Sequence, residues 1–226
     1  MNTETPPETL PDHTLPVPDE PNPRDRYGAC DQLARAVEDA LAGVVLDPFF
    51  DPEQVLRPQL GYSIHVPEGV HSGATQIVAV DAFAQPWPSP CDSVRTIYAN
   101  PRFSGGGTKA ALRLLHDCMG QGRAEAAVFI GPANLGSDYH RAHGFPNMGA
   151  IGHLGRWDFD PLVDMPAKGK LRRVKKGQRS KGGSASEVVA VLMLGPERNA
   201  YPYRYVDRFD RAMRAIGVPV SFARDV

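Results

Sequence analysis

The stretch VRTIYANPRFSGGGTKAALRLLHDCMG, residues 94–120, decides the fold because its apolar pattern changes period halfway along. Residues 94–99 are a short run of apolar, β-branched and aromatic side chains, which predicts a buried strand ending at Asn100. Beyond a glycine-rich turn, apolar side chains recur at helical spacing, with Thr108 as the expected N-cap. Those side chains are Ala111, Leu112, Leu115, Cys118 and Met119. The stretch therefore predicts a strand, a turn and a helix.

The same alternation continues on both sides of this stretch. Helical spacing predicts helices over 30–42 and 205–217. Continuous apolar runs predict buried strands over 44–46, 75–80, 126–131 and 187–195. Because strands alternate with helices and show no polar face, we expect an α/β protein with a mostly parallel sheet and helices on both faces.

Two segments differ in composition from this pattern. Residues 1–24 hold seven prolines, five acids and one base, which predicts a disordered acidic arm before a domain over 25–226. The whole chain carries a net charge of −1, so the part after the arm carries +3. Within it, 167–184 is expected to be a basic loop. Without the eight cations of that loop, the rest of the domain would carry −5.

Composition excludes several classes of protein. No apolar run approaches the roughly 18 residues of a membrane helix, and the first residues lack the features of a signal peptide. The three cysteines are far apart, which excludes a CxxC zinc site and a disulfide framework. We therefore expect a cytoplasmic protein with no membrane partner and no metal site.

Three of the expected strands end in a polar residue: Asp47, Asp81 and Asn100. Ligands of open α/β sheets bind at the carboxyl edge of the strands, so these side chains are candidates for one binding crevice. A single acid at a strand end is also a common turn former or helix cap, and this alternative stays open for each residue.

The tetrapeptide after the strand 94–99 is the most specific chemical feature. An exocyclic base amine is weakly nucleophilic because its lone pair is delocalised into the ring. A protein that uses it needs acceptors for the amine protons and an aromatic ring against the extruded base. Asn100, the carbonyl of Pro101 and Phe103 offer these groups on a stiff turn. Asn-Pro also favours ordinary turns, so the motif alone leaves both interpretations open.

IYANPRFSGGGTKAA resembles the catalytic segment of the phage-type DNA N-6-adenine-methyltransferase family. Further segments resemble that family in the same order, over roughly 27–220. They are VVLDPFFDPE, VDAFAQPWPS, AVFIGPANLGSDYHR, GRWDF, EVVAVLMLGPE and RFDRAMRAIGVPV. The family typically has a second proline where this chain has Arg102, and small residues where it has Phe49-Phe50.

The resemblance implies a Rossmann-like methyltransferase fold and methyl transfer from S-adenosylmethionine to the N6 amine of adenine in DNA, in a bacterial or phage-infected cell. Asn100, Pro101 and Phe103 would be catalytic, and Asp47, Pro48 and Asp81 would shape the cofactor site. Arg102 places a cation beside the target amine and loosens the turn. It favours a second hypothesis, a catalytically inactive methyltransferase-fold protein that binds DNA or a protein partner.

The basic run is the other candidate for function. Eight cations lie within fourteen residues that contain no acid, as phosphate neutralisation requires. They are Lys168, Lys170, Arg172, Arg173, Lys175, Lys176, Arg179 and Lys181. DNA is therefore the expected partner, although a solvated connector is the alternative. His140 and His143 share an expected helix, but two imidazoles without a third ligand are more often structural.

Overall fold

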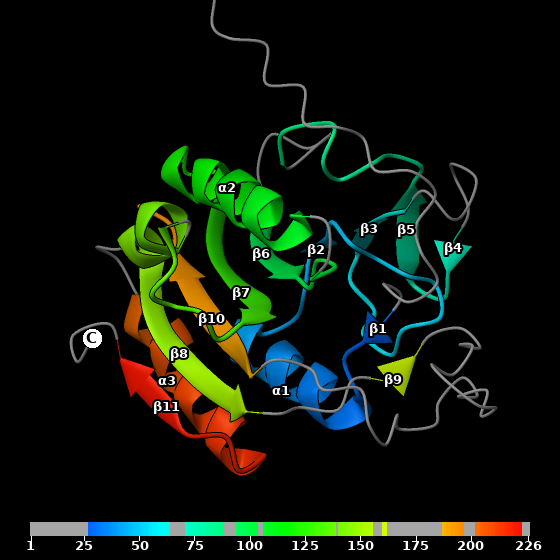
Figure 1. Ribbon diagram of the computed structural model, residues 1–226. Coiled ribbons are helices and arrows are strands. Elements are labelled where there is room, and N and C mark those ends of the chain that lie inside the picture. The colour runs from blue at the N-terminus through cyan, green and yellow to red at the C-terminus, as the bar shows by residue number, and fades with distance from the viewer. Residues whose placement is uncertain are drawn as a thin grey trace, which may run out of the picture.

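The computed structural model of the protein describes residues 27–63, 71–87, 94–103, 106–138, 140–155, 160–161, 187–196 and 202–222. Nine strands form one sheet in the order β11-β8-β10-β7-β6-β2-β3-β5-β4 (Figure 1). In chain order they are β2 (Leu46–Asp47), β3 (Leu60–Tyr62), β4 (His71–Ser72), β5 (Thr75–Val78), β6 (Val94–Ala99), β7 (Ala124–Pro132), β8 (Met148–Gly155), β10 (Val188–Leu194) and β11 (Val220–Phe222). A separate two-stranded sheet pairs β1 (Tyr27–Gly28) with β9 (Asp160–Pro161).

The middle of the sheet is parallel. Strands β7, β6, β2, β3 and β5 all run in one direction. The chain enters this region at β2, builds outward through β3 to β5, and then crosses back to place β6 and β7 on the other side of β2. The direction of building therefore reverses between the neighbouring strands β2 and β6.

The sheet is mostly parallel, as expected, because six of its nine strands run in one direction, but it is mixed because both of its ends pair antiparallel. Strand β10 pairs antiparallel with β7 and with β8, and β11 and β4 are antiparallel edge strands. The continuous apolar run of β10 correctly indicates that both of its faces are buried, and all seven of its residues are. Burial on two faces does not fix strand direction, however, because a covered antiparallel strand needs the same side chains.

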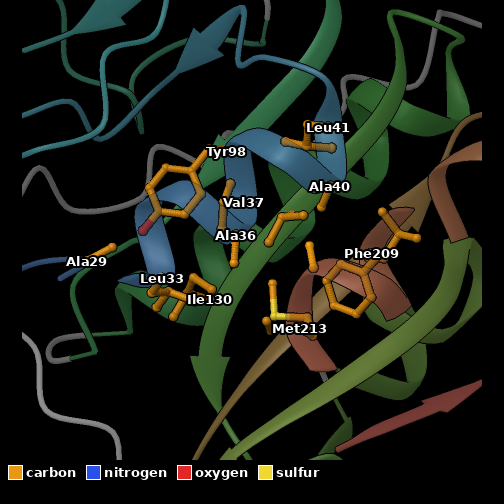
Figure 2. Close-up of a cluster of buried hydrophobic side chains, with 14 of the residues drawn as sticks. Ala29, Leu33, Ala36, Val37, Ala40, Leu41, Tyr98, Ile130, Phe209 and Met213 are labelled. Atoms are coloured by element: carbon orange, nitrogen blue, oxygen red, sulfur yellow. The ribbon is translucent and has the colours of Figure 1, made fainter. Parts of the chain in front are cut away.

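Helices cover both faces of the sheet. On one face α1 (Asp31–Leu41) and α3 (Pro202–Ala215) pack together over a cluster that includes Leu33, Phe209 and Met213 (Figures 1 and 2). On the other face lie α2 (Gly107–Gly120) and the short helices η2 (His140–Gly144) and η3 (Phe145–Asn147) (Figure 1). Side chains of β10 alternate between the two clusters, so this strand is the centre of the core.

The start of α2 differs from the sequence expectation. The N-cap is Gly106, whose φ of 78° is a left-handed conformation that favours glycine, and Thr108 lies inside the first turn. Gly107 has no space for a side chain, because a Cβ there would lie 2.7 Å from the carbonyl oxygen of Arg102. The two glycines therefore start the helix two residues earlier than a threonine cap would.

Some expectations fall on parts of the chain outside these ranges. The arm 1–24 and the basic loop 167–184 lie outside the described residues. All eight cations that we assign to nucleic-acid binding belong to that loop and lie outside them too. Of the helices that the structure does describe, none has the length and apolar character needed to cross a membrane.

Candidate functional site at the carboxyl edge of the parallel strands

The three polar residues that end strands in the sequence lie at one edge of the sheet. Asp47 is the last residue of β2, and Asn100 directly follows β6, the parallel neighbour of β2. Asp81 follows β5 after Val80, and β5 is joined to β2 through β3. Since parallel strands present their carboxyl ends on the same side, the loops that carry these residues emerge together.

Asp47 is held inside the protein. Its side chain is 1% exposed, and its carboxylate accepts hydrogen bonds from the backbone N–H of Phe49 (2.8 Å) and from Nε2 of Gln54 (2.7 Å). Burial raises the pKa of Asp47 to about 7, and the nearby Asp51 adds to the rise, whereas the two hydrogen bonds oppose it. Asp47 therefore fixes the shape of the turn that begins at the buried Pro48, and its charge is sensitive to pH near neutrality.

The neighbouring Phe49 and Phe50 both pack inward. Phe50 is 2% exposed and lies over Gly61 of β3, where a Cβ would come within 2.5 Å of the phenylalanine ring. Phe49 contacts the rings of Phe83 (centroids 5.2 Å apart) and Trp87 (5.4 Å, edge-on). These two phenylalanines therefore fill space that smaller residues would leave open, and they attach the turn after β2 to the loop after β5.

The loop after β5 is built around Trp87. Its indole is 1% exposed, and Nε1 donates a hydrogen bond to the carbonyl oxygen of Ala82 (2.8 Å). At the start of this loop, Asp81 accepts a hydrogen bond from the backbone N–H of Phe83 (2.9 Å) and is half-buried. Asp81 is thus accessible to a ligand to a degree that Asp47 is not, and the buried Trp87 is the packing anchor of this loop.

The turn after β6 carries the catalytic candidates. Asn100 is half-buried, Pro101 is buried, and Phe103 is 38% exposed, one of the few large apolar side chains at the described surface. The guanidinium of Arg102 lies over the ring of Phe83, 5.6 Å from its centroid, and the Arg102 carbonyl is closely packed against Gly107. Arg102 therefore joins the turn after β6 to the loop after β5, rather than leaving that turn loose.

Three buried polar atoms, in these loops and in the adjoining first turn of α2, have no hydrogen-bond partner among the described residues. They are Nε2 of Gln85, Nε of Arg102 and Oγ1 of Thr108. Buried polar groups are normally satisfied, so such a concentration at one sheet edge is what a ligand or ordered water would complete. The hydroxyl of Tyr98 is a fourth unpartnered atom, but it lies on the opposite face, among side chains of α1 (Figure 2).

Several of these residues were not expected from the sequence. Gln54 and Gln85 carry no motif, because their roles depend on how the loops fold. The aromatic cluster of Phe49, Phe83 and Trp87 was visible only as separate aromatic residues in two segments. No sequence signal pairs a turn with a loop more than thirty residues away.

The two histidines of η2 lie beside α2. His140 is 1% exposed and meets the ring of Phe129 edge-on, and burial lowers its pKa. The ring of His143 lies 5.5 Å from that of His116. Within the described ranges, no three histidine, cysteine or acidic side chains are grouped closely enough to hold a metal ion.

A scan against models of protein families finds no match to this chain, and a search among curated proteins finds none either. We therefore infer function from the residues, their order along the chain and their geometry.

Proposed function

We propose that the protein is an S-adenosylmethionine-dependent DNA adenine-N6 methyltransferase of phage or prophage type, on a Rossmann-like methyltransferase fold. The observation that carries the proposal is the position of Asn100-Pro101. This dipeptide directly follows β6, at the point where the direction of building reverses beside β2. Open α/β sheets bind their ligands at such a switch point.

The strand order supports the fold assignment. Strands β2, β3, β5, β6, β7 and β8 run in one direction and, numbered in chain order, lie as 3-2-1-4-5-6. This is the order of doubly wound nucleotide-binding sheets. In this protein β10 is inserted antiparallel between β7 and β8, the fifth and sixth strands of that order.

The groups at this edge suit the cofactor. S-adenosylmethionine presents a carboxylate, an ammonium group and ribose hydroxyls, and when bound it supplies a methyl group on a cationic sulfur. The half-buried Asp81 is an acceptor for hydroxyls or the ammonium group, while Asp47 and Pro48 shape the turn beside it. Unpartnered Nε2 of Gln85 and Oγ1 of Thr108 are buried donors for the carboxylate.

The turn after β6 would position the target base. The side-chain oxygen of Asn100 and the carbonyl of Pro101 accept hydrogen bonds from the two amine protons, which draws the amine lone pair out of conjugation. The exposed ring of Phe103 stacks on the extruded adenine. As the amine nitrogen bonds to the methyl carbon, the bond from that carbon to sulfur would break, S-adenosylhomocysteine would leave, and one held proton would pass from the amine to water. The residues thus act by positioning and electrostatics, without a covalent intermediate.

Two measurements on the full chain test the proposal. Calorimetry with S-adenosylmethionine should show saturable binding. Incubation with the cofactor and duplex DNA should give N6-methyladenine, detected by mass spectrometry of the nucleosides, and a duplex of inosine–cytosine pairs should take up no methyl group. Cofactor binding without any methylated adenine in duplex or single-stranded DNA would refute the assignment of substrate.

The second candidate function is an inactive descendant that binds DNA or a protein partner. The observation that favours it is Arg102, which occupies the family's second proline position and is fixed by Phe83 and Gly107. A silent titration with S-adenosylmethionine, together with retained DNA binding, is the result expected of this candidate.

A further inference from the structure

The outer face of α2 and the adjoining helix η2 bring together basic side chains that are scattered in the sequence. Lys109, Arg113 and His116 are spaced by four and three residues, so they lie along one side of α2. His143 of η2 stands beside His116, with ring centroids 5.5 Å apart. We call these four residues the α2–η2 face.

The structure holds His116 in place. Nδ2 of Asn147, in η3, donates a hydrogen bond to Nδ1 of His116 (2.9 Å). Lys109 is exposed, whereas Arg113, His116 and His143 are half-buried. The face therefore combines one exposed cation with three half-buried basic side chains.

The charged and titratable groups around His143 on this face are mostly basic. Burial lowers the pKa of His143, and the basic groups around it lower the pKa further. Those groups are His116, Arg113 and Lys109, and Asp117 alone opposes them. Within the described part of the chain, no ion pair joins Lys109 or Arg113 to an acid.

In α3, by contrast, two of the arginines are paired with acids. Arg204 of α3 pairs with Glu125 (2.6 Å), and Arg214 pairs with Asp210 four residues earlier (2.6 Å). Acids are interleaved with the arginines of α3, whereas α2 contains none before Asp117. The cations of α2 thus remain available to an external anion.

We infer that the α2–η2 face binds the phosphate backbone of duplex DNA on one side of the target adenine. This inference rests on the proposed function. The position beside the target base follows because α2 begins immediately after the turn that carries Asn100 and Phe103. Lys109 and His116 are separated by about 10 Å along the helix axis, which matches about three base steps of one strand. With phosphates bound there, the candidate site would lie at one end of the contacted stretch of DNA.

An apolar partner does not suit this face. The exposed large apolar side chains of the described residues are Val55 and Phe103, and neither lies on α2 or η2. The face offers unpaired charge instead, and a polyanion complements it. The cations here are also distinct from the run 168–181, so the two sets can be tested separately.

The test is a salt series of duplex binding with Lys109→Gln/Arg113→Gln. Glutamine keeps helix propensity and removes charge. When the logarithm of the affinity is plotted against the logarithm of the salt concentration, the slope should be less steep by about 2 units in this variant. Each lost phosphate contact contributes about 0.9 to the slope. The matched control is Arg208→Gln/Arg211→Gln, which removes two exposed arginines from α3 on the opposite face of the sheet. Its slope should equal that of the wild type.

Parallel assays of adenine methylation on the same samples separate this inference from the proposed function. Equal slopes for the α2 variant and the wild type, with methylation intact, would overturn the α2–η2 face and leave the function standing. A reduced slope without methylation by any of the proteins would support the face and favour the inactive descendant. Wild-type protein that fails to bind duplex DNA, or equal losses in both variants, would overturn the face.

Discussion

The two halves of the sheet are built in different ways. In one half β7, β10 and β8 have nine, seven and eight residues and pair along their lengths. In the other half β2, β3 and β5 have only two, three and four residues. The long strands are held by backbone ladders and apolar burial, whereas the short strands depend on their loops.

Side chains hold those loops in place of backbone ladders. Oγ1 of Thr75 donates to the carbonyl of Pro58 (2.6 Å), and Oγ1 of Thr96 donates to that of Gly43 (2.8 Å). Unpartnered buried polar atoms occur in the loop after β5 and the turn after β6, and Nδ1 of His143 in η2 is another, but in the described structure none lies on the strands β7, β8 or β10 themselves. The long-strand half therefore supplies stability, whereas the loops of the short-strand half carry polar groups that can serve chemistry.

The largest expected effect concerns chemistry at the short-strand half. Asn100→Ala should lower the rate of adenine methylation by about 100-fold to 1000-fold, because it removes the acceptor that we propose for the reacting amine. DNA affinity should stay within about twofold. The matched control is Asn134→Ala, an exposed asparagine just beyond β7 at the same sheet edge, which should retain the wild-type rate. Single-turnover methylation measures both, and equal losses would contradict the role of Asn100.

The second effect concerns the stability of the long-strand half. Leu192→Ala in β10 should lower the free energy of unfolding by about 3 to 4 kcal/mol, because the fully buried side chain leaves a cavity between long paired strands. Leu60→Ala in β3 should cost about 2 kcal/mol, because neighbouring loops can relax into the space. Urea unfolding measures the difference. An equal or larger loss of unfolding free energy for Leu60→Ala would contradict the proposed difference in stability between the two halves.

The third effect is a pH dependence of stability that belongs to Asp47. Its folded pKa is about 7 and the ordinary value is 3.8, so between these values the folded state retains a proton that the unfolded state has lost. The contribution of Asp47 to stability is therefore complete below about pH 4 and is lost as the pH rises to 7. Between pH 5 and 7 the loss should be about 2 kcal/mol.

The variant Asp47→Asn should remove this part of the pH dependence. Urea unfolding at pH 5 and pH 7, with Asp81→Asn as a control in the neighbouring loop, checks it. If the free energy of unfolding changes with pH in the same way in the wild type and in Asp47→Asn, the pH dependence does not belong to Asp47.

The smallest effect concerns Arg102. Arg102→Pro should preserve or raise methyl transfer, because proline stiffens the turn that holds the acceptors. It should also lower the free energy of unfolding by about 1 kcal/mol, because the guanidinium no longer lies over Phe83. Thermal unfolding and methylation assays measure the two changes. A tenfold or greater fall in methyl transfer would show that Arg102 itself acts on the substrate.

The sequence predicted elements better than it predicted contacts. The strand 94–99 matches β6 residue for residue, because an apolar run that stops at Asn-Pro has clear limits. The start of α2 was wrong because Gly106 takes the cap position and the close approach of Arg102 requires glycine at 107. The antiparallel direction of β10 could not be predicted, because a buried apolar run carries no directional information.

For the candidate site, local positions were predictable and the connections between loops were not. Asp47, Asp81 and Asn100 follow strands, so their common edge could be inferred from the alternation of elements. The hydrogen bond from Gln54 to Asp47 and the stack of Arg102 on Phe83 depend on loop paths that no periodicity records. Lys109 and Arg113 were overlooked because cations four residues apart gather on a helix without forming a run.

The insertion of β10 between β7 and β8 has a consequence during synthesis. Strands β7 and β8 leave the ribosome well before β10, yet they reach one another only through it. Until about residue 194 has emerged, both strands carry an unpaired edge, and the side chains that later meet β10 are exposed to water. A nascent or truncated chain that contains β7 and β8 but ends before residue 188 is therefore the form most prone to aggregation, and chaperones should hold it longest.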